Sequence, residues 1–192
     1  MKGAKEMLWF YTLPGEEKGH IDSNAAIEAC IERISRGDAA SLEQLYGYVK
    51  TSVYAFAFSI LKNPYDAEDV THDLLIRVWE SAAGYTPCGK PMAWILTVAR
   101  NLCLMKLRGE RNHSELSEWI AVAAETETAE DRILIAKCME QLSEEERQVV
   151  VLHAVAGFKH REIAQFTHLS LGSVLSKYNR ALKKLKKICE GE

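Results

Sequence analysis

Residues Gly157–Lys187 read GFKHREIAQFTHLSLGSVLSKYNRALKKLKK and contain the most informative pattern in the chain. Helical periodicity runs on both sides of a short break at 168–170, which predicts helices at 159–167 and 170–189. Within this stretch there are eight Lys or Arg residues against one acidic residue, Glu162, although the whole chain has a net charge of −3. Such a local excess of positive charge indicates a polyanionic partner at one end of the protein.

Two helices joined by a tight turn form the pattern of a helix-turn-helix, in which the start of the second helix meets base edges in the major groove. Ser170 is a favourable N-cap for that second helix. We therefore predict base contacts from Ser173 and Lys177, and phosphate contacts from Arg180 and Lys184 further along. The remaining candidates for duplex DNA are Ser176, Lys159 and Arg161. The predicted core side of the second helix consists of Val174, Tyr178, Ala181, Leu182, Leu185 and Ile188. A basic face that is merely solvated is the alternative.

Composition excludes several other classes of protein. The chain has 192 residues, of which 47% are hydrophobic and 27% charged, as expected of an ordinary soluble protein. The apolar stretch 7–13 is too short to span a membrane and lacks a signal-peptide cleavage site. The five cysteines are scattered and form no C-x-x-C pair, which favours a cytoplasmic location without zinc or disulfides.

Helical periodicity and charge together predict an all-α fold of two small helical domains joined by a flexible acidic linker. Residues 110–131 carry one basic and seven acidic groups, so they are the predicted linker. An N-terminal extension of unknown role at 1–22 and a helical domain at 23–109 precede it, and the helix-turn-helix domain at 132–192 follows. Besides the two helices above, we expect helices near 24–36, 39–62, 64–82, 91–109, 129–141 and 144–156.

The helix expected at 64–82 carries a charged edge. Asn63 and Pro64 form a strong start signal, because Asn caps free amides and Pro fits the first turn. Ala67, Val70, Thr71, Leu74, Leu75 and Val78 form the predicted apolar face. At its edge lie Asp66, Asp69, Asp73 and Arg77. The alternatives are a solvated surface, a metal site including His72, or a surface that binds a basic partner. No second set of ligands supports the metal site, so we expect neither a metal nor a cofactor.

The helix expected at 91–109 places Trp94, Asn101 and Arg108 on one side and Ile95, Ala99 and Leu102 on another. The first set combines an aromatic surface, an amide and a cation, which suits single-stranded nucleic acid. Ordinary half-buried packing is the alternative. The preceding loop adds Tyr85 and Lys90.

Four segments in this order resemble the bacterial sigma factors. DAEDVTHDLLIRVWE (66–80), the loop with Tyr85 and PMAWILTVARN (91–101) resemble region two of the short extracytoplasmic-function (ECF) type. LSEEERQVVVLHAVAGFKHREIAQFTHLSLGSVLSKYNRALKKL (142–185) resembles region four. The resemblance covers roughly residues 35–188. The chain departs from the family where Gly is common at 168 and a basic residue at 175, since it has His168 and Leu175 there.

This resemblance implies a dissociable RNA polymerase subunit that recruits the enzyme to −10 and −35 promoter elements and helps melt the DNA. The segment 66–79 would bind the β′ clamp helices through Asp66, Asp69, His72, Asp73, Arg77 and Trp79. The −10 element would be opened by Tyr85, Lys90, Trp94, Asn101 and Arg108. Region four would read the −35 element beside the β flap, and an anti-sigma factor is an expected partner.

No catalytic residue is expected of such a protein. The main alternative is a conventional helix-turn-helix regulator whose residues 1–109 form a sensor or dimerisation domain. That alternative leaves the aromatic and amide stripe of 91–109 and the charged edge of 64–82 without a role. A carboxylate-metal hydrolase is a third hypothesis, which the missing ligands weigh against.

Overall fold

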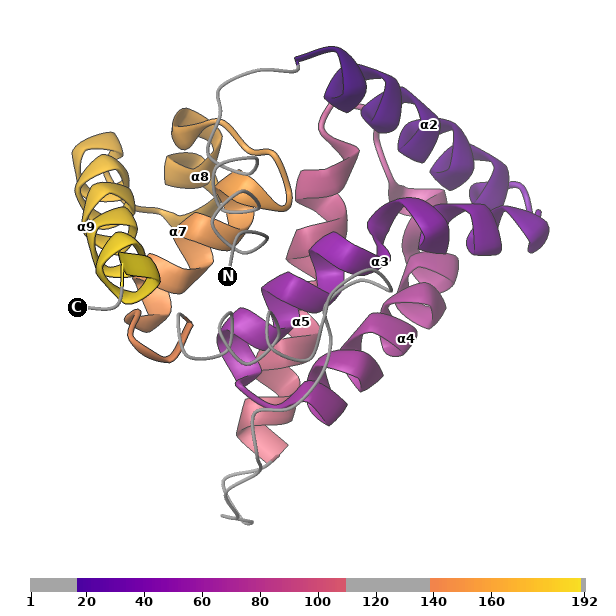
Figure 1. Cartoon of the computed structure of the whole chain (residues 1–192). Helices are drawn as coiled ribbons and strands as arrows, with labels where there is room; N and C mark the ends of the chain where they lie inside the picture. Colours follow the sequence, from indigo (N-terminus) through magenta and orange to yellow (C-terminus); the bar gives the residue numbers. More distant parts are fainter. Residues whose placement is uncertain (1–16, 110–138, 191–192) are drawn as a thin grey trace. The chain divides into compact units, whose positions relative to one another are not determined.

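The computed structural model describes residues 17–109 and 139–190, and contacts group them into two compact units, one in each range. Both described ranges are helical and contain no β-strand (Figure 1). The predicted all-α fold is therefore confirmed for this part of the chain. Residues 1–16 of the predicted extension and the predicted linker at 110–131 lie outside the described residues. So does the helix predicted at 129–141, apart from residues 139–141, of which 139–140 are helical.

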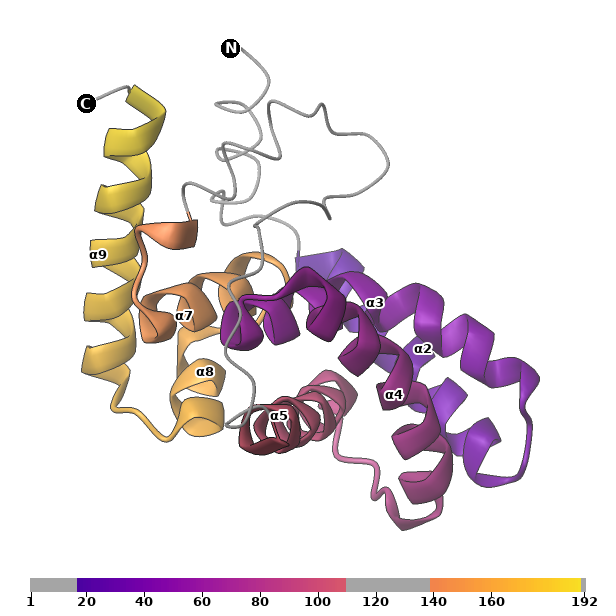
Figure 2. The ribbon, with the colours of Figure 1, turned by 90° about the horizontal axis from the view of Figure 1, so that it is seen from below.

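Residues 17–109, the described part of the N-terminal unit, form a bundle of four α-helices with one short 3-10 turn. Its elements are α2 (Glu17–Ser35), α3 (Ala40–Leu61), α4 (Pro64–Ser81), η1 (Ala82–Gly84) and α5 (Pro91–Gly109). Helices α2, α4 and α5 all pack against α3 (Figures 1 and 2). The fully buried side chains at their contacts include Ile27, Ile31, Leu45, Val49, Phe56, Leu74, Ile95 and Leu96. Burial of this apolar surface is the main force that holds the unit together.

Local signals explain where these helices start. The Asn63 side chain accepts hydrogen bonds from the backbone N–H groups of Tyr65 (2.9 Å) and Asp66 (3.3 Å), and Pro64 occupies the first turn, as predicted. The predicted apolar faces are also confirmed, because Ala67, Val70, Thr71, Leu74 and Val78 of α4 are buried and Leu75 is half-buried. Helix α2 begins at Glu17, seven residues before its predicted start. The segment 17–23 has no apolar periodicity, so the sequence pattern missed it.

The helices of the C-terminal unit within residues 139–190 include α7 (Glu144–Ala154), α8 (His160–Thr167) and α9 (Leu171–Glu190). Helix α9 packs against α7 and also contacts α8 (Figure 2). One buried cluster joins α9 to α7 and to the segment before α7, and consists of Leu142, Val150, Ala181 and Leu185 with Met139, Tyr178 and Ile188 against it. The predicted core side of α9 is confirmed, since Val174, Ala181 and Leu185 are buried and Tyr178, Leu182 and Ile188 are half-buried.

The turn between α8 and α9 falls at the predicted break. His168 ends α8 in the left-handed conformation, with φ of 57° and ψ of 28°. The next backbone N–H, of Leu169, donates to the carbonyl of Ala164 at 3.1 Å. Ser170 then caps α9, because its hydroxyl accepts the N–H of Ser173 at 3.1 Å. The helix-turn-helix geometry is therefore present in the structure.

Candidate nucleic-acid interface

The loop between η1 and α5 is held by a single carboxylate of α2. The Tyr85 hydroxyl donates to Glu28 Oε1 at 2.9 Å. The backbone N–H groups of Cys88 and Gly89 donate to the same oxygen, at 3.2 and 3.0 Å. Desolvation by burial and the hydrogen bond to Glu28 raise the pKa of Tyr85 well above its ordinary value. The phenol is thus a neutral donor fixed in one orientation.

Trp94, in the first turn of α5, packs against this loop through the ring of Tyr85. Its ring centroid lies 5.0 Å from that of Tyr85, with the ring planes tilted by 55°. This distance is typical of a favourable aromatic pair. The two predicted residues Tyr85 and Trp94 are therefore brought together, and Lys90 is exposed beside them.

The remaining stripe of α5 faces outward. Asn101, Met105 and Arg108 are exposed, whereas Ile95, Ala99 and Leu102 on the other side are buried as expected. Met105 adds an apolar side chain that is 56% exposed. Helix α5 thus presents an aromatic residue, an amide and a cation along one side, in the order predicted.

The charged edge of α4 divides into two parts. Lys106 of α5 donates to Asp66 at 2.5 Å and to Asp69 at 2.9 Å. The Asp66 side chain is 13% exposed and the Asp69 side chain is 66% exposed. Asp66 therefore holds α4 to α5, while most of Asp69 stays on the surface. This differs from the prediction that both carboxylates face a partner, because sequence spacing does not show which neighbouring helix supplies a cation.

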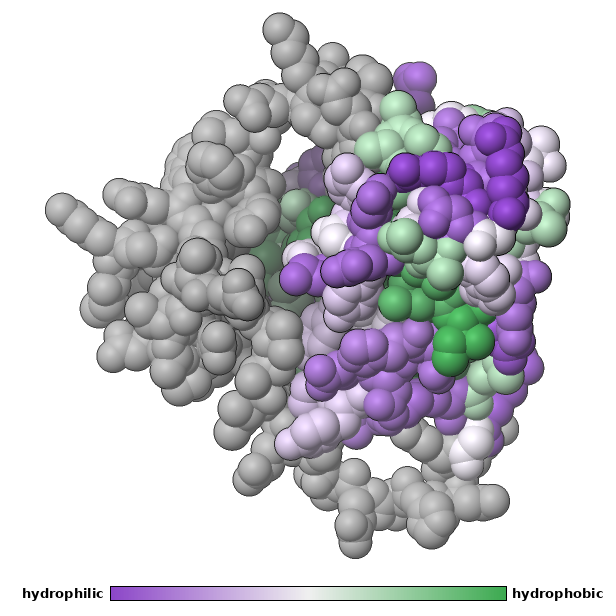
Figure 3. Space-filling model, turned by 90° about the vertical axis from the view of Figure 1, so that its right-hand side faces the viewer, coloured by the Kyte–Doolittle hydropathy of each residue, from purple (hydrophilic) through white to green (hydrophobic). Residues whose placement is uncertain are grey.

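The rest of α4 exposes a mixed surface. Asp73 and Arg77 are exposed, with Arg77 donating to Glu80 at 2.9 Å, and the exposed His72 stacks on Tyr46 with centroids 5.9 Å apart. The large apolar side chains exposed on this helix are Tyr65, Ile76 and Trp79. Figure 3 shows a compact hydrophobic area in green within a mostly hydrophilic face of the N-terminal unit. Apolar side chains ringed by charge are typical of a protein-binding surface.

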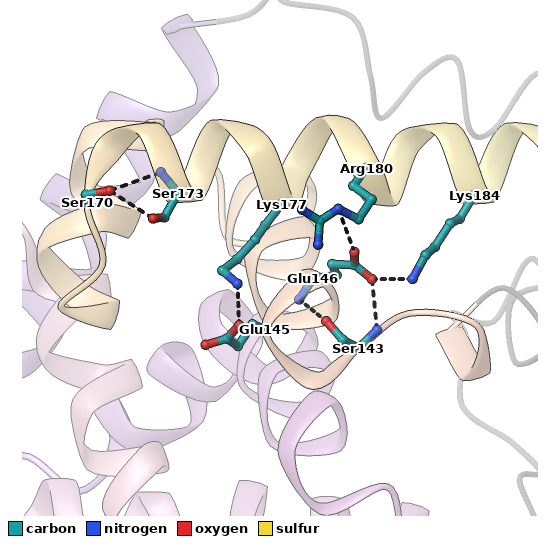
Figure 4. A network of polar contacts seen from close by, with 8 residues as sticks. All are labelled: Ser143, Glu145, Glu146, Ser170, Ser173, Lys177, Arg180 and Lys184. Carbon is teal, nitrogen blue, oxygen red and sulfur yellow. Dashed lines mark hydrogen bonds and ion pairs between the residues drawn. The ribbon is translucent and has the colours of Figure 1, made fainter.

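On α9 the predicted basic residues do not all face solvent (Figure 4). Lys177 is paired with Glu145 of α7 and its side chain is only 21% exposed. Lys184 donates to Glu146 at 2.7 Å, and Arg180 lies 3.8 Å from the other oxygen of that carboxylate. Lys177 and Lys184 therefore lie at the flank of α9 next to α7, and not directly opposite its buried side as the sequence predicts.

Glu146 is the centre of this network. It is 2% exposed and forms a reciprocal capping box with Ser143. Desolvation by burial opposes its ionisation, but hydrogen bonds from Lys184 and the Ser143 backbone, with the charges of Lys184 and Arg180, outweigh it and lower the pKa of Glu146. Glu146 of α7 is therefore a buried anion that holds α9 through Lys184 and Arg180.

The most exposed side of α9 includes a residue that the sequence prediction left out. Asn179 is exposed one turn after the exposed Ser176, and Arg180 is 61% exposed. Asn is a typical base reader in the major groove, since its amide can pair with adenine. Its spacing from Ser176 was the signal that could have found it. Glu28 was also missed, and no sequence signal connects it with a tyrosine 57 residues away.

The other predicted residues of the C-terminal unit are placed as follows. Ser173 is half-buried and hydrogen-bonded to Ser170, with the two hydroxyls 2.9 Å apart. Lys159 and Arg161 are exposed at the start of α8.

Among residues 17–109 and 139–190, no three His, Cys, Asp or Glu side chains are grouped in a way that could hold a metal ion. In the same ranges no helix has the length and apolar content needed to cross a membrane.

Comparison with known proteins assigns both units to one family. Residues 45–113 match the model of sigma-70 region 2, and residues 132–185 match that of sigma-70 region 4. The ECF RNA polymerase sigma factor SigK of Mycolicibacterium vanbaalenii is 25% identical over 174 residues, which cover 85% of this chain and 89% of the relative. SigK of Mycobacterium tuberculosis is 25% identical over 171 residues, covering 83% and 91% of the two chains.

Two solved structures share the fold. The sigma factor RpoE of Bartonella quintana, in complex with the anti-sigma factor NepR, matches with a TM-score of 0.65 and 21% identity, over 77% of this chain and 96% of that one. CnrH, in complex with the cytosolic domain of CnrY, matches with a TM-score of 0.60 and 19% identity, over 87% and 99%. The conventional regulator is not favoured, because it accounts for region 4 but not for region 2. With both regions present in the family's order, the chain belongs to the sigma-70 family as an ECF sigma factor that directs RNA polymerase to promoters.

Proposed function

We propose that the two units divide promoter recognition, with the N-terminal unit opening the −10 element and the C-terminal unit holding the −35 duplex. The observation that carries this proposal is the side of α5 on which Trp94 packs against Tyr85 and the exposed amide of Asn101 follows two turns later. Taking a base out of the stack costs a few kcal/mol, which a receptive surface can offset without ATP. Lys90 and Arg108 are exposed cations that could reach the backbone of the opened strand.

For the −35 element, the exposed side of α9 supports major-groove docking. Ser176, Asn179 and Arg180 lie on this side, and Ser173 lies in the first turn, where its backbone N–H donates to the capping Ser170. Lys177 and Lys184 would reach DNA from the flank of α9, once their ion pairs with Glu145 and Glu146 are broken. We therefore assign them to contacts with phosphates or with bases at the margin of the interface. Lys159 and Arg161 at the start of α8 would clamp the backbone.

Core polymerase would bind α4 through the side that remains exposed. This side fits a partner that presents both cations and apolar side chains, and we propose that the partner is the β′ clamp helices. The residues concerned are Asp69, His72, Asp73, Arg77 and Trp79. Asp66 contributes to this surface only indirectly, by fixing α4 against α5 through Lys106. The C-terminal unit would lie at the β flap.

The protein would act by binding alone, without catalysis, metal or cofactor, and in the cytoplasm where polymerase and promoters are found. An anti-sigma factor is the further partner we propose. The support is that the RpoE of Bartonella quintana was solved with the anti-sigma factor NepR. Such a partner would cover surfaces that polymerase uses.

In vitro transcription with core polymerase on a pool of genomic promoter fragments tests the proposal and reveals the promoter sequence. Lys177→Ala should weaken −35 duplex binding while leaving strand opening on bound promoters intact. Asn101→Ala should do the reverse, with weaker permanganate reactivity at the −10 element. Equal damage to both steps by both variants would contradict the division of labour.

A further inference from the structure

Glu28 of α2 receives three hydrogen bonds from one loop, and all three converge on the same oxygen. The donors are the Tyr85 hydroxyl and the backbone N–H groups of Cys88 and Gly89, at 2.9, 3.2 and 3.0 Å. They lie 57 to 61 residues from Glu28 in the sequence. A charged acceptor makes stronger hydrogen bonds than a neutral one, so this carboxylate fixes the loop from the opposite helix.

The backbone of the loop is shaped to make these contacts. Gly89 has a φ of 70°, in the left-handed region that favours glycine. Two consecutive N–H groups, of Cys88 and Gly89, then point to the carboxylate. Residues 86–90 of this loop are all exposed, so burial of their side chains does little to fix its conformation. Glu28 therefore supplies most of the order that the described contacts give this loop.

We propose that Glu28 is a positioning residue for strand opening, which sets the Tyr85 loop in the conformation that receives an unstacked base. This inference rests on the proposed −10 function of the loop. The hydrogen bond from the Tyr85 hydroxyl to Glu28 and the packing of its ring on Trp94 reduce the conformational freedom that Tyr85 would lose when DNA binds. A preorganised site binds more tightly because the ordering cost is already met on folding.

Removing the charge of Glu28 would have two opposite effects on the affinity for DNA, which makes the role of this carboxylate testable. If Glu28 acts only through its charge, its neutralisation should strengthen binding to the polyanion. If it positions the loop, its neutralisation should weaken that binding. Glu32, one turn later on α2, is the matched control, since it is exposed and pairs with Arg36 rather than with the loop.

The measurement uses holoenzyme reconstituted with the full-length chain and a single-stranded oligonucleotide carrying the non-template −10 sequence of a promoter that the wild-type holoenzyme transcribes. We expect Glu28→Gln to weaken oligonucleotide binding about three- to tenfold relative to Glu32→Gln, as expected for lost charge-assisted hydrogen bonds. Tyr85→Phe, which removes one of the three donors, should weaken it less. Binding to the −35 duplex should be unchanged in all three variants.

The outcomes separate the two proposals. If wild-type holoenzyme binds the −10 oligonucleotide no better than a scrambled one, the proposed function of the loop fails. If wild type discriminates but Glu28→Gln binds as tightly as Glu32→Gln or more tightly, the positioning role of Glu28 is wrong. Urea unfolding of each variant measures whether the helical bundle is intact. If the loss of oligonucleotide binding is no larger than the fraction of unfolded protein explains, the inference is also wrong.

Discussion

Lys177 of α9, the predicted base-reading lysine, forms an ion pair with Glu145 in the first turn of α7, 32 residues earlier in the chain. Glu145 is itself 56% exposed, so the pair lies at the edge of the helix-turn-helix and not in its core. In the proposed binding of the −35 duplex, DNA would therefore have to compete with Glu145 for this lysine. The affinity for DNA would then depend on a residue of α7 as well as on α9.

Neutralising Glu145 should strengthen duplex binding. Glu145→Gln frees Lys177 and removes a negative charge near the phosphates, so we expect about two- to fivefold tighter binding to a −35 duplex at moderate salt. The slope of log K against log salt concentration should steepen, because the freed lysine now releases a counterion on binding. Glu144→Gln is the control, since Glu144 lies in the same turn and bonds to Gln148. Equal effects of the two variants would mean that only long-range charge matters.

Glu146 should make the stability of the chain depend on pH in the acid range. Its pKa in the folded state is lowered below the ordinary value of 4.5, so its contribution is fully present above that value and is lost as pH falls through the folded-state pKa. Glu146→Gln should lower the free energy of unfolding by about 2 kcal/mol at pH 7 and reduce the further loss between pH 5 and 3. Urea unfolding at each pH measures both effects. An unchanged acid profile in the variant would show that other carboxylates dominate.

His160 should contribute a second pH dependence, at higher pH. Its ring lies 4.3 Å from that of His153 and 4.8 Å from that of Tyr178, centroid to centroid. Desolvation and the neighbouring His153 lower the pKa of His160 below 6.5. The unfolded chain then binds the proton more readily, so stability falls as pH drops below about 6.5. His160→Gln should flatten the decline in urea-unfolding free energy between pH 7.5 and 5.5, whereas His168→Asn at the exposed turn should not.

The two carboxylates that Lys106 contacts should have separable roles. Asp66→Asn leaves Lys106 with a weaker partner in a partly buried place, so we expect a loss of about 1–2 kcal/mol in unfolding free energy. Asp69→Asn should leave stability within about 0.5 kcal/mol of wild type, since its side chain is mostly exposed. It should instead weaken binding to core polymerase, measured by competition between labelled wild type and variant. Stronger destabilisation by Asp69→Asn than by Asp66→Asn would contradict this division.

The turn of the helix-turn-helix should tolerate glycine better than histidine. His168 has a φ of 57°, which costs a residue with a Cβ atom about 1–2 kcal/mol. His168→Gly removes this strain but adds freedom to the unfolded chain, so we expect a net gain of about 0.5–1 kcal/mol in unfolding free energy. His168→Val should be destabilising at the same position. A loss of stability in the glycine variant would show that the imidazole makes a compensating contact.

Much of the fold could be predicted because helix formation and burial depend on local periodicity. The start at Asn63, the break at 168–170 and the core sides of α4, α5 and α9 all follow from residues three or four apart. The start of α2 at Glu17 could not be predicted in this way, since the segment lacks an apolar stripe.

The sequence by itself determined the helices, their buried sides and the ordered pair of regions that identifies the family, because each is written in short-range spacing. Only the tertiary structure decided which charged side chains are paired within the protein and which remain exposed for a partner. Lys106 reaches Asp66 across 40 residues, Glu28 reaches Tyr85 across 57, and Glu145 reaches Lys177 across 32. Such pairs depend on how one helix is rotated and inclined against another, which the period of a single helix does not contain.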